Sequence, residues 1–165
     1  VFLPIVTGQK AVGPIDKVQL VAEAFYYGSG MSAVVGDRLI ARVYSDGKVE
    51  FEDVEKGTTG FSMKRSRILP EKLKKLIELL SERNMSKISD SYDAIYPTID
   101  HTENLRLNLL VEGKLRTIDV ANFKPNLPKT QNVYPAQMIE IVCLLESFRE
   151  DAEIKFFLRE IPRCK

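Results

Sequence analysis

The chain has 165 residues, of which 44% are hydrophobic and 28% charged, the profile of one folded domain rather than of a disordered segment. Its 24 basic and 23 acidic side chains give a formal net charge of +1. That balance argues against a protein that binds nucleic acid through an excess of positive charge. No apolar run approaches the roughly 20 residues that span a bilayer, so we expect no membrane span.

The start of the chain bears on domain organisation and location. Residues 1–16 contain two prolines and two glycines and are predicted to form an extended arm, followed by a single α+β domain over residues 17–161. The chain begins with Val1 instead of Met, in a short apolar stretch that would follow a cleaved leader or a trimmed end. On this ground we favour a bacterial protein outside the cytoplasm, either periplasmic or secreted.

The clearest local signal is a hairpin at Asp46-Gly47. Residues 39–45 and 48–54 read as strands, and Asp-Gly between them is typical of a two-residue type I′ turn. That turn would place Tyr44 opposite Val49. One face would then carry four mainly apolar side chains: Ile40, Tyr44, Val49 and Phe51. The other face is expected to be wet, which is typical of an antiparallel sheet.

A second hairpin is predicted around Glu112-Gly113. A two-residue loop here would place Leu107 opposite Ile118 and Arg106 opposite Asp119, an apolar pair on one face and an ion pair on the other. A further strand is expected from Val18 until the chain reaches Gly28-Ser29-Gly30, where a flexible loop to Gly36 is predicted. Two more strands are expected over residues 61–68 and 154–161.

Two amphipathic helices are predicted, each opened by a proline. Pro70 begins a helix to about Arg83, with apolar side chains at helical spacing: Leu69, Leu73, Leu76, Ile77 and Leu80. Pro135 begins a second helix to about Arg149, with these side chains on the core side: Met138, Ile141, Val142, Leu145 and Phe148. The expected fold is therefore an α+β domain, an antiparallel sheet built from hairpins with two amphipathic helices packed on one face.

Two long polar loops, residues 86–103 and 122–133, hold the candidate binding residues. These are Tyr92, Asp93, Tyr96, Asp100, His101 and Phe123. Closely spaced carboxylates can bind a hard cation or transfer protons, but Asp and Ser also favour turns by bonding to nearby backbone. No glycine occurs between Gly60 and Gly113, so the calcium loop of an EF-hand is not present. We favour the turn interpretation.

His101 is the single histidine of the chain, and no motif such as Gly-x-Ser-x-Gly accompanies it. Cys143 and Cys164 are the two cysteines, far apart in sequence, and we expect neither a zinc site nor any cofactor. A buried free thiol is the favoured interpretation of Cys143, and a bridge to Cys164 is left open for an oxidising compartment.

The run Lys64-Arg65-Ser66-Arg67 places three positive charges in four residues. Such a run can contact an acidic partner, but a solvated strand edge that discourages further pairing is the more ordinary interpretation.

As a layout, residues 20–148 resemble small bacterial domains that include the emfourin-type metallopeptidase inhibitors. The shared elements are a strand with Tyr27-Gly28-Ser29-Gly30, a strand with Asp46-Gly47, a helix announced by Leu69-Pro70-Glu71-Lys72-Leu73, a Tyr/Asp loop, a hairpin and a last helix after Pro135. The Gly-Gly start of that family is absent from this chain, and no site residue is carried over.

The function expected from the sequence is a non-catalytic binding domain whose partner is another protein, with its oligomeric state left open. No catalytic residue is assigned. The alternative is a small hydrolase or a cation-dependent enzyme that uses Asp93, Asp100 and His101.

Overall fold

The computed structural model describes residues 17–30, 37–55, 60–95, 101–124 and 133–149, with the side chains of residues 29, 30 and 101–103 left out of the description. The elements within these ranges are, in chain order, β1 (Leu20–Gly30), β2 (Arg38–Tyr44), β3 (Lys48–Val54), β4 (Phe61–Arg67), α1 (Pro70–Leu79), α2 (Glu82–Met85), β5 (Ser91–Tyr92), β6 (His101–Val111), β7 (Lys114–Val120) and α3 (Ala136–Ser147). The predicted N-terminal arm and the predicted strand over residues 154–161 lie outside the described residues.

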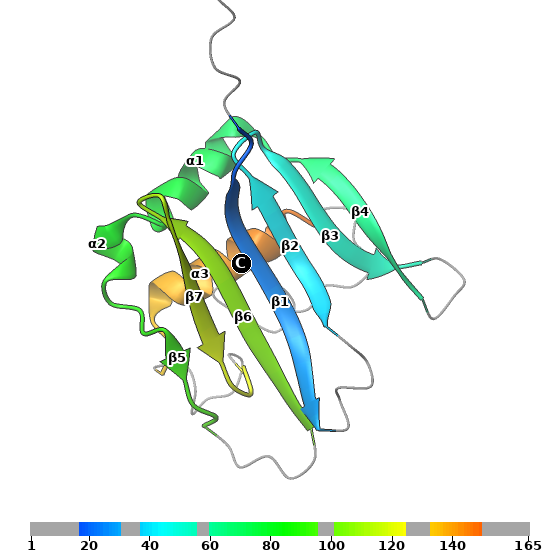
Figure 1. The fold of residues 1–165 in the computed structure, drawn as a ribbon, viewed down its shortest axis with the longest axis vertical. Coiled ribbons are helices and arrows are strands. Elements are labelled where there is room, and N and C mark those ends of the chain that lie inside the picture. The colour runs from blue at the N-terminus through cyan, green and yellow to red at the C-terminus, as the bar shows by residue number, and fades with distance from the viewer. Residues whose placement is uncertain (1–16, 31–36, 56–59, 96–100, 125–132, 150–165) are drawn as a thin grey trace, which may run out of the picture.

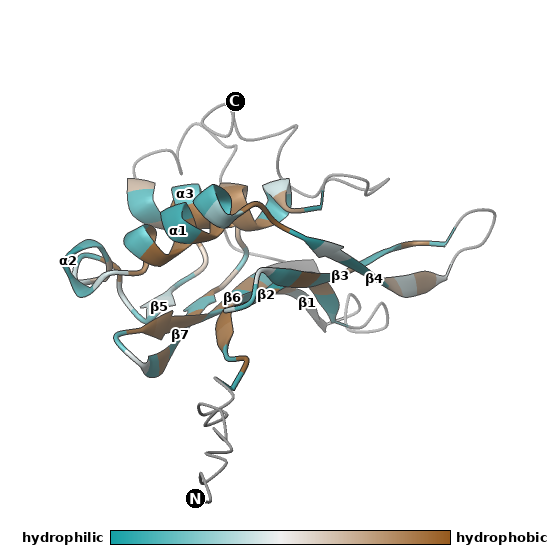
Figure 2. Cartoon of the chain, turned by 90° about the horizontal axis from the view of Figure 1, so that it is seen from above, coloured by the Kyte–Doolittle hydropathy of each residue, from teal (hydrophilic) through white to brown (hydrophobic). Residues whose placement is uncertain are grey.

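The strands form one sheet in the order β4-β3-β2-β1-β6-β7-β5 (Figure 1). Neighbouring strands are antiparallel except for β5, which runs parallel to β7. The predicted α+β class with a mostly antiparallel sheet is therefore confirmed. Helices α1 and α3 lie over one face (Figure 2), and no described helix or strand covers the other. Among the described helices, none has the length and apolar character needed to cross a bilayer.

The hairpin of β2 and β3 differs from its predicted register by one residue. Val43, rather than Tyr44, lies opposite Val49, and Arg42 lies opposite Glu50. The Gly47 N–H donates to the Tyr44 carbonyl over 2.9 Å, and Gly47 has φ +80°. The loop thus has three residues with a glycine in the left-handed region, instead of a two-residue type I′ turn. As a result, Tyr44 lies on the polar face with Glu50 and not on the apolar face.

The hairpin of β6 and β7 has the predicted register. Leu107 lies opposite Ile118, and Arg106 opposite Asp119. Glu112 has φ 47° and Gly113 has φ 77°, so both residues of the two-residue turn have the positive φ that a type I′ turn requires.

Helix α1 is shorter than predicted, and a short third helix follows it. The chain is extended at Ser81, which has ψ 148°, so the helix does not continue to Arg83. The chain changes direction at Ser81, and Met85 of α2 lies in the core, where it is 1% exposed. The amphipathic pattern places Ile77 and Leu76 together on the apolar side of the helix, but Ile77 is 52% exposed, whereas Leu76 is fully buried.

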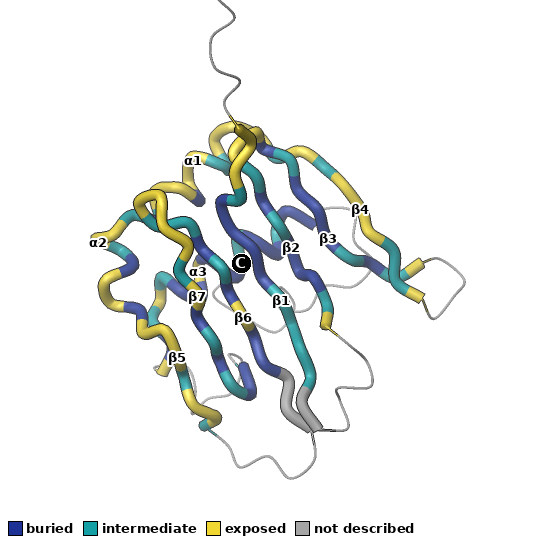
Figure 3. Tube along the Cα trace, viewed as in Figure 1, coloured by how far each residue is buried: buried dark blue, intermediate teal, exposed yellow. Residues whose placement is uncertain are grey.

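The core lies between the helices and the covered face of the sheet, and many of its buried residues are on the central strands (Figure 3). Its strand residues include Ala22, Ala24, Val43, Val49, Leu105, Leu107, Leu109, Ile118 and Val120. The predicted core side of the last helix is confirmed, since all its named residues are buried: Met138, Ile141, Val142, Leu145 and Phe148. Just after this helix, the fully buried Arg149 donates to the Glu52 carbonyl over 2.8 Å and so joins the end of α3 to β3.

Candidate functional site

The uncovered face of the sheet carries polar side chains that are joined from strand to strand by hydrogen bonds and, between Arg42 and Glu50, by an ion pair at 3.6 Å. They occupy one position on each of β7, β6, β1, β2, β3 and β4, and we call them the polar row: Thr117, Asn108, Glu23, Arg42, Glu50 and Arg65. Because successive side chains of a strand point to opposite faces, the apolar core and the polar row share the same strands.

The first half of the polar row is centred on Glu23 of β1, which is only 7% exposed. The Thr117 hydroxyl donates to Asn108 Oδ1 over 2.8 Å, and Asn108 Nδ2 donates to Glu23 Oε2 over 3.0 Å. Arg42 Nε donates to the other carboxylate oxygen of Glu23. Both oxygens of this carboxylate are therefore held in place.

The second half is centred on Glu50 of β3. Its carboxylate lies 2.9 Å from Lys48 Nζ, 3.2 Å from Arg65 Nε and 3.6 Å from Arg42 Nη1, and it accepts a hydrogen bond from the Tyr44 hydroxyl over 3.0 Å. These donors favour the charged form and lower the pKa of Glu50 to about 2, with the hydrogen bond from Lys48 as the largest cause. Glu50 is thus a carboxylate with more than one positive partner.

A second set of polar contacts joins Tyr27, in the C-terminal half of β1, to Arg106 of β6 and Asp119 of β7. Arg106 Nε donates to Asp119 Oδ1 over 2.7 Å, which confirms the predicted ion pair. The Tyr27 hydroxyl donates to the same oxygen over 3.4 Å, and the Arg106 guanidinium lies 5.3 Å from the centre of the Tyr27 ring. Burial, and then the charge of Asp119, raise the pKa of Tyr27.

The structure brings together two of the predicted binding residues, Tyr92 and Phe123. The Tyr92 ring packs edge-on against Tyr134 at 6.0 Å, and the Phe123 ring lies 5.1 Å from the same tyrosine. Phe123 is 1% exposed, and the Tyr92 hydroxyl accepts a hydrogen bond from the Ser89 N–H over 3.0 Å. Phe123 and Tyr134 therefore belong to the hydrophobic core, and Tyr92 packs against it.

The structure describes less of the other predicted site residues. Asp93 is exposed just after β5. Tyr96 and Asp100 lie outside the described residues, and His101 begins β6 with its side chain outside the description. Within the described part of the chain, no three His, Cys, Asp or Glu side chains are grouped so that they could hold a metal ion.

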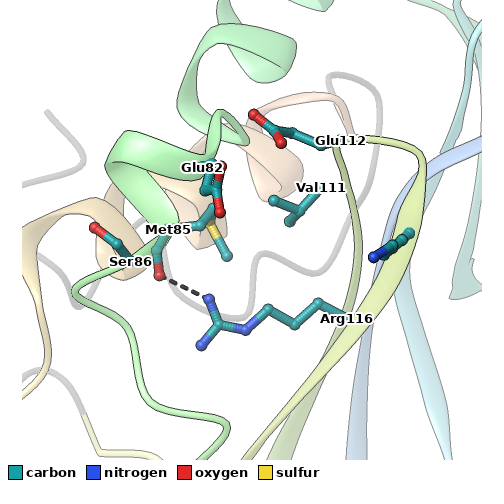
Figure 4. Close-up of a pocket in the computed structure, with 7 residues that line it drawn as sticks. Glu82, Met85, Ser86, Val111, Glu112 and Arg116 are labelled. Carbon is teal, nitrogen blue, oxygen red and sulfur yellow. Dashed lines mark hydrogen bonds between the residues drawn. The ribbon is translucent and has the colours of Figure 1, made fainter.

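A pocket of about 510 Å³ lies between α2 and the β6–β7 hairpin (Figure 4). It is lined by Glu82, Met85, Ser86, Val111, Glu112, Lys114 and Arg116. The Arg116 side chain is already engaged, since it donates to the Met85 carbonyl over 2.7 Å, to the Ile88 carbonyl, and to Asp90 over 2.6 Å. We therefore assign Arg116 a structural role at the end of α2.

Cys143 of α3 is half-buried and disulfide-bonded, so the expectation of a free buried thiol is wrong. The other cysteine of the chain, Cys164, lies outside the described residues. Disulfides persist mainly in oxidising compartments, and the location expected from the sequence stays a prediction.

Comparison with known proteins adds no family to these observations. No protein-family model matches the chain, and no curated protein matches it.

Proposed function

We propose that this protein is a non-catalytic binding domain that presents the uncovered face of its sheet to another protein. The observation that supports this proposal is the polar row, which crosses six strands and holds its charged groups in a fixed arrangement. A surface whose charged groups are already ordered loses less conformational entropy on binding than a surface of mobile side chains. Fixed charges also select a partner with a complementary pattern.

The size of the face suits a protein partner better than a small molecule. Six strands about 4.8 Å apart, each about seven residues long, form a surface of roughly 24 Å by 23 Å. This surface of roughly 550 Å² is somewhat smaller than the roughly 800 Å² that each partner contributes to a standard interface. The face would therefore provide most of one side of a modest interface.

The charges of the face suit a polar partner. Arg106 is about half exposed and Arg65 largely exposed, each beside a carboxylate, with side-chain exposures of 47% and 71%. Arginine is enriched at protein interfaces because its planar group binds carboxylates through two hydrogen bonds and also packs on aromatic rings.

The test is to block the face without dismantling the polar row. Thr117→Arg places a long charged side chain at the exposed β7 end of the row, while Glu23, Arg42 and Glu50 keep their partners. Ile77→Arg places the same side chain on the exposed surface of α1 and serves as the matched control. Proteins that bind the immobilised wild-type chain are identified by mass spectrometry. The dissociation constant of each such protein is then measured with the purified wild-type chain and with both variants.

We expect Thr117→Arg to weaken binding by about tenfold or more, and Ile77→Arg to leave it unchanged. Equal affinity of all three chains for every partner would contradict the proposal. So would hydrolytic activity that is lost in Asp93→Asn and His101→Gln, since those residues belong to the alternative enzyme.

A further inference from the structure

Strand β4 forms one end of the described sheet. Every second residue of β4 directs its backbone N–H and C=O groups outward, away from β3. The Glu55 N–H donates to the Gly60 carbonyl and the Ile68 N–H to the Gly47 carbonyl, each over 3.0 Å. Bonded and non-bonded pairs alternate in an antiparallel ladder, so the residues of β4 that bond to β3 are Ser62, Lys64 and Ser66. The remaining four residues direct N–H and C=O groups to the outer edge: Phe61, Met63, Arg65 and Arg67.

The outer edge of β4 has neither a bulge nor a proline, and its basic side chains discourage pairing with any strand that does not neutralise them. Its pairing with β3 runs without a register shift over seven residues, from Lys48 opposite Arg67 to Val54 opposite Phe61. The strand contains no proline, and no described strand pairs with its outer side. Regular edges of this length are templates for the addition of another strand.

Charge and hydrophobicity divide β4 into two halves. The half nearer α1 carries Lys64, Arg65 and Arg67, and the side chains of the two arginines are 71% and 72% exposed. Their carboxylate neighbours are Glu50 and Asp46. The other half carries Phe61 and the 47% exposed Met63. Figure 3 shows that the basic half is mostly exposed.

We propose that β4 binds an extended acidic segment of a partner protein as an added antiparallel strand. This inference rests on the proposed binding function and names the partner's chemistry. Backbone hydrogen bonds to the outer edge supply affinity, and cross-strand side-chain pairs supply selectivity. An antiparallel segment meets Arg67 first and Phe61 last. It therefore carries acidic residues opposite Arg67, Arg65 and Lys64, and apolar residues opposite Met63 and Phe61.

The probe is a synthetic acetylated and amidated peptide with this pattern, Thr-Asp-Thr-Glu-Glu-Val-Thr-Val-Thr. In the intended register its Asp lies opposite Arg67 and its last Val opposite Phe61. One control peptide has Lys in place of Asp and both Glu residues. A second control has N-methyl groups on the Asp, the first Glu and both Val residues, which removes the N–H groups that would face β4 while the side chains stay the same. Binding is measured by fluorescence anisotropy and located by NMR shifts.

A matched pair of protein variants tests the backbone edge. Met63→Pro removes an N–H that faces outward and makes no bond to β3, a position where proline is tolerated. Met63→Ala shortens the same side chain and keeps the N–H. We expect saturable binding of the acidic peptide to the wild-type chain, weakening by about tenfold or more in Met63→Pro, and a much smaller change in Met63→Ala. Arg65→Gln with Arg67→Gln should weaken binding and reduce its dependence on salt.

Several outcomes would overturn the inference. One is that the acidic peptide does not bind; the others are that the lysine peptide or the N-methylated peptide binds as tightly as the acidic peptide. The N-methylated peptide tests the backbone edge even if Met63→Pro does not fold. Partner binding lost in Thr117→Arg but kept in Met63→Pro also overturns the β4 inference and leaves the proposed function standing. If the acidic peptide binds while no protein partner responds to Thr117→Arg, the β4 site stands and the open-face function fails.

Discussion

The two faces of the sheet are made by the same strands but are stabilised by different physics. Leu107 and Asn108 are adjacent in β6, yet Leu107 is fully buried under the helices, whereas Asn108 donates to Glu23 on the uncovered face. The covered face gains free energy in proportion to the apolar area removed from water, which salt hardly changes. The uncovered face depends on charged hydrogen bonds near solvent, which salt and pH do change. We therefore expect the covered face to provide most of the stability, and the uncovered face is the one that we propose for recognition.

The largest effect should come from shortening a core residue on the covered face. Leu107→Ala leaves a cavity between β1, β6 and β7 and is expected to lower the free energy of unfolding by about 2–5 kcal/mol. Denaturant titration measures this loss, and added salt should leave it nearly unchanged. A loss similar to that of Asn108→Ala would break the distinction between the faces.

Asn108→Ala tests the uncovered face at the neighbouring position. It removes one hydrogen bond to Glu23 and one from Thr117, and we expect a loss of about 1–2 kcal/mol in the free energy of unfolding. The double variant with Thr117→Ala should cost less than the sum of the two single variants, because both remove the same hydrogen bond. If the losses of the two single variants add fully in the double variant, Asn108 and Thr117 do not interact energetically.

The pH dependence of the uncovered face should be visible at Glu50. The folded state lowers its pKa from the ordinary value of 4.5 to about 2. The stabilisation that Glu50 provides is therefore complete above about pH 4.5 and is lost as the pH falls toward 2. We expect the stability difference between wild type and Glu50→Gln to shrink across this range, as measured by denaturant midpoints. A stability difference between the two chains that does not change with pH would contradict the assigned role of Glu50.

The smallest effect should come from Ile77→Ala on α1. Because Ile77 is 52% exposed, the change should cost less than about 0.5 kcal/mol. Its neighbour Leu76 is fully buried, and Leu76→Ala should cost about 2–5 kcal/mol. Comparable losses from the two variants would mean that α1 presents a different side to the sheet.

The sequence predicts most of the described elements but misses α2 and β5, and it predicts the details of strand pairing less well. Asp46-Gly47 and Glu112-Gly113 look alike as turn signals, yet the first lies in a three-residue loop and the second forms the two-residue turn. A difference of one residue in a loop is small in sequence, but it transfers Tyr44 to the opposite face. The pairing of β2 with β3 shows which loop forms, and the two turn residues alone do not.

The uncovered face was not predicted because its contacts join residues distant in sequence. Arg106 and Asp119 were recognisable because a single hairpin brings them together. Glu23 and Asn108 are 85 residues apart, and no local pattern shows that β1 lies between β2 and β6. The available signal was the recurrence of charged residues at alternate positions of the predicted strands, which indicates a wet face but not its partners.

The contacts of Arg116 have a consequence for how the molecule opens. This side chain of β7 binds the carbonyls of Met85 and Ile88, while the backbone N–H of Asp119 donates to the Asp90 carbonyl over 2.9 Å. The segment from α2 to β5 therefore cannot separate from β7 without losing several bonds at once. In native-state hydrogen exchange, the bonded amides of this segment and of β7 should become exposed as one cooperative unit, with a common free energy of opening. In Arg116→Met, the amides of residues 85–92 should exchange faster than those of β7.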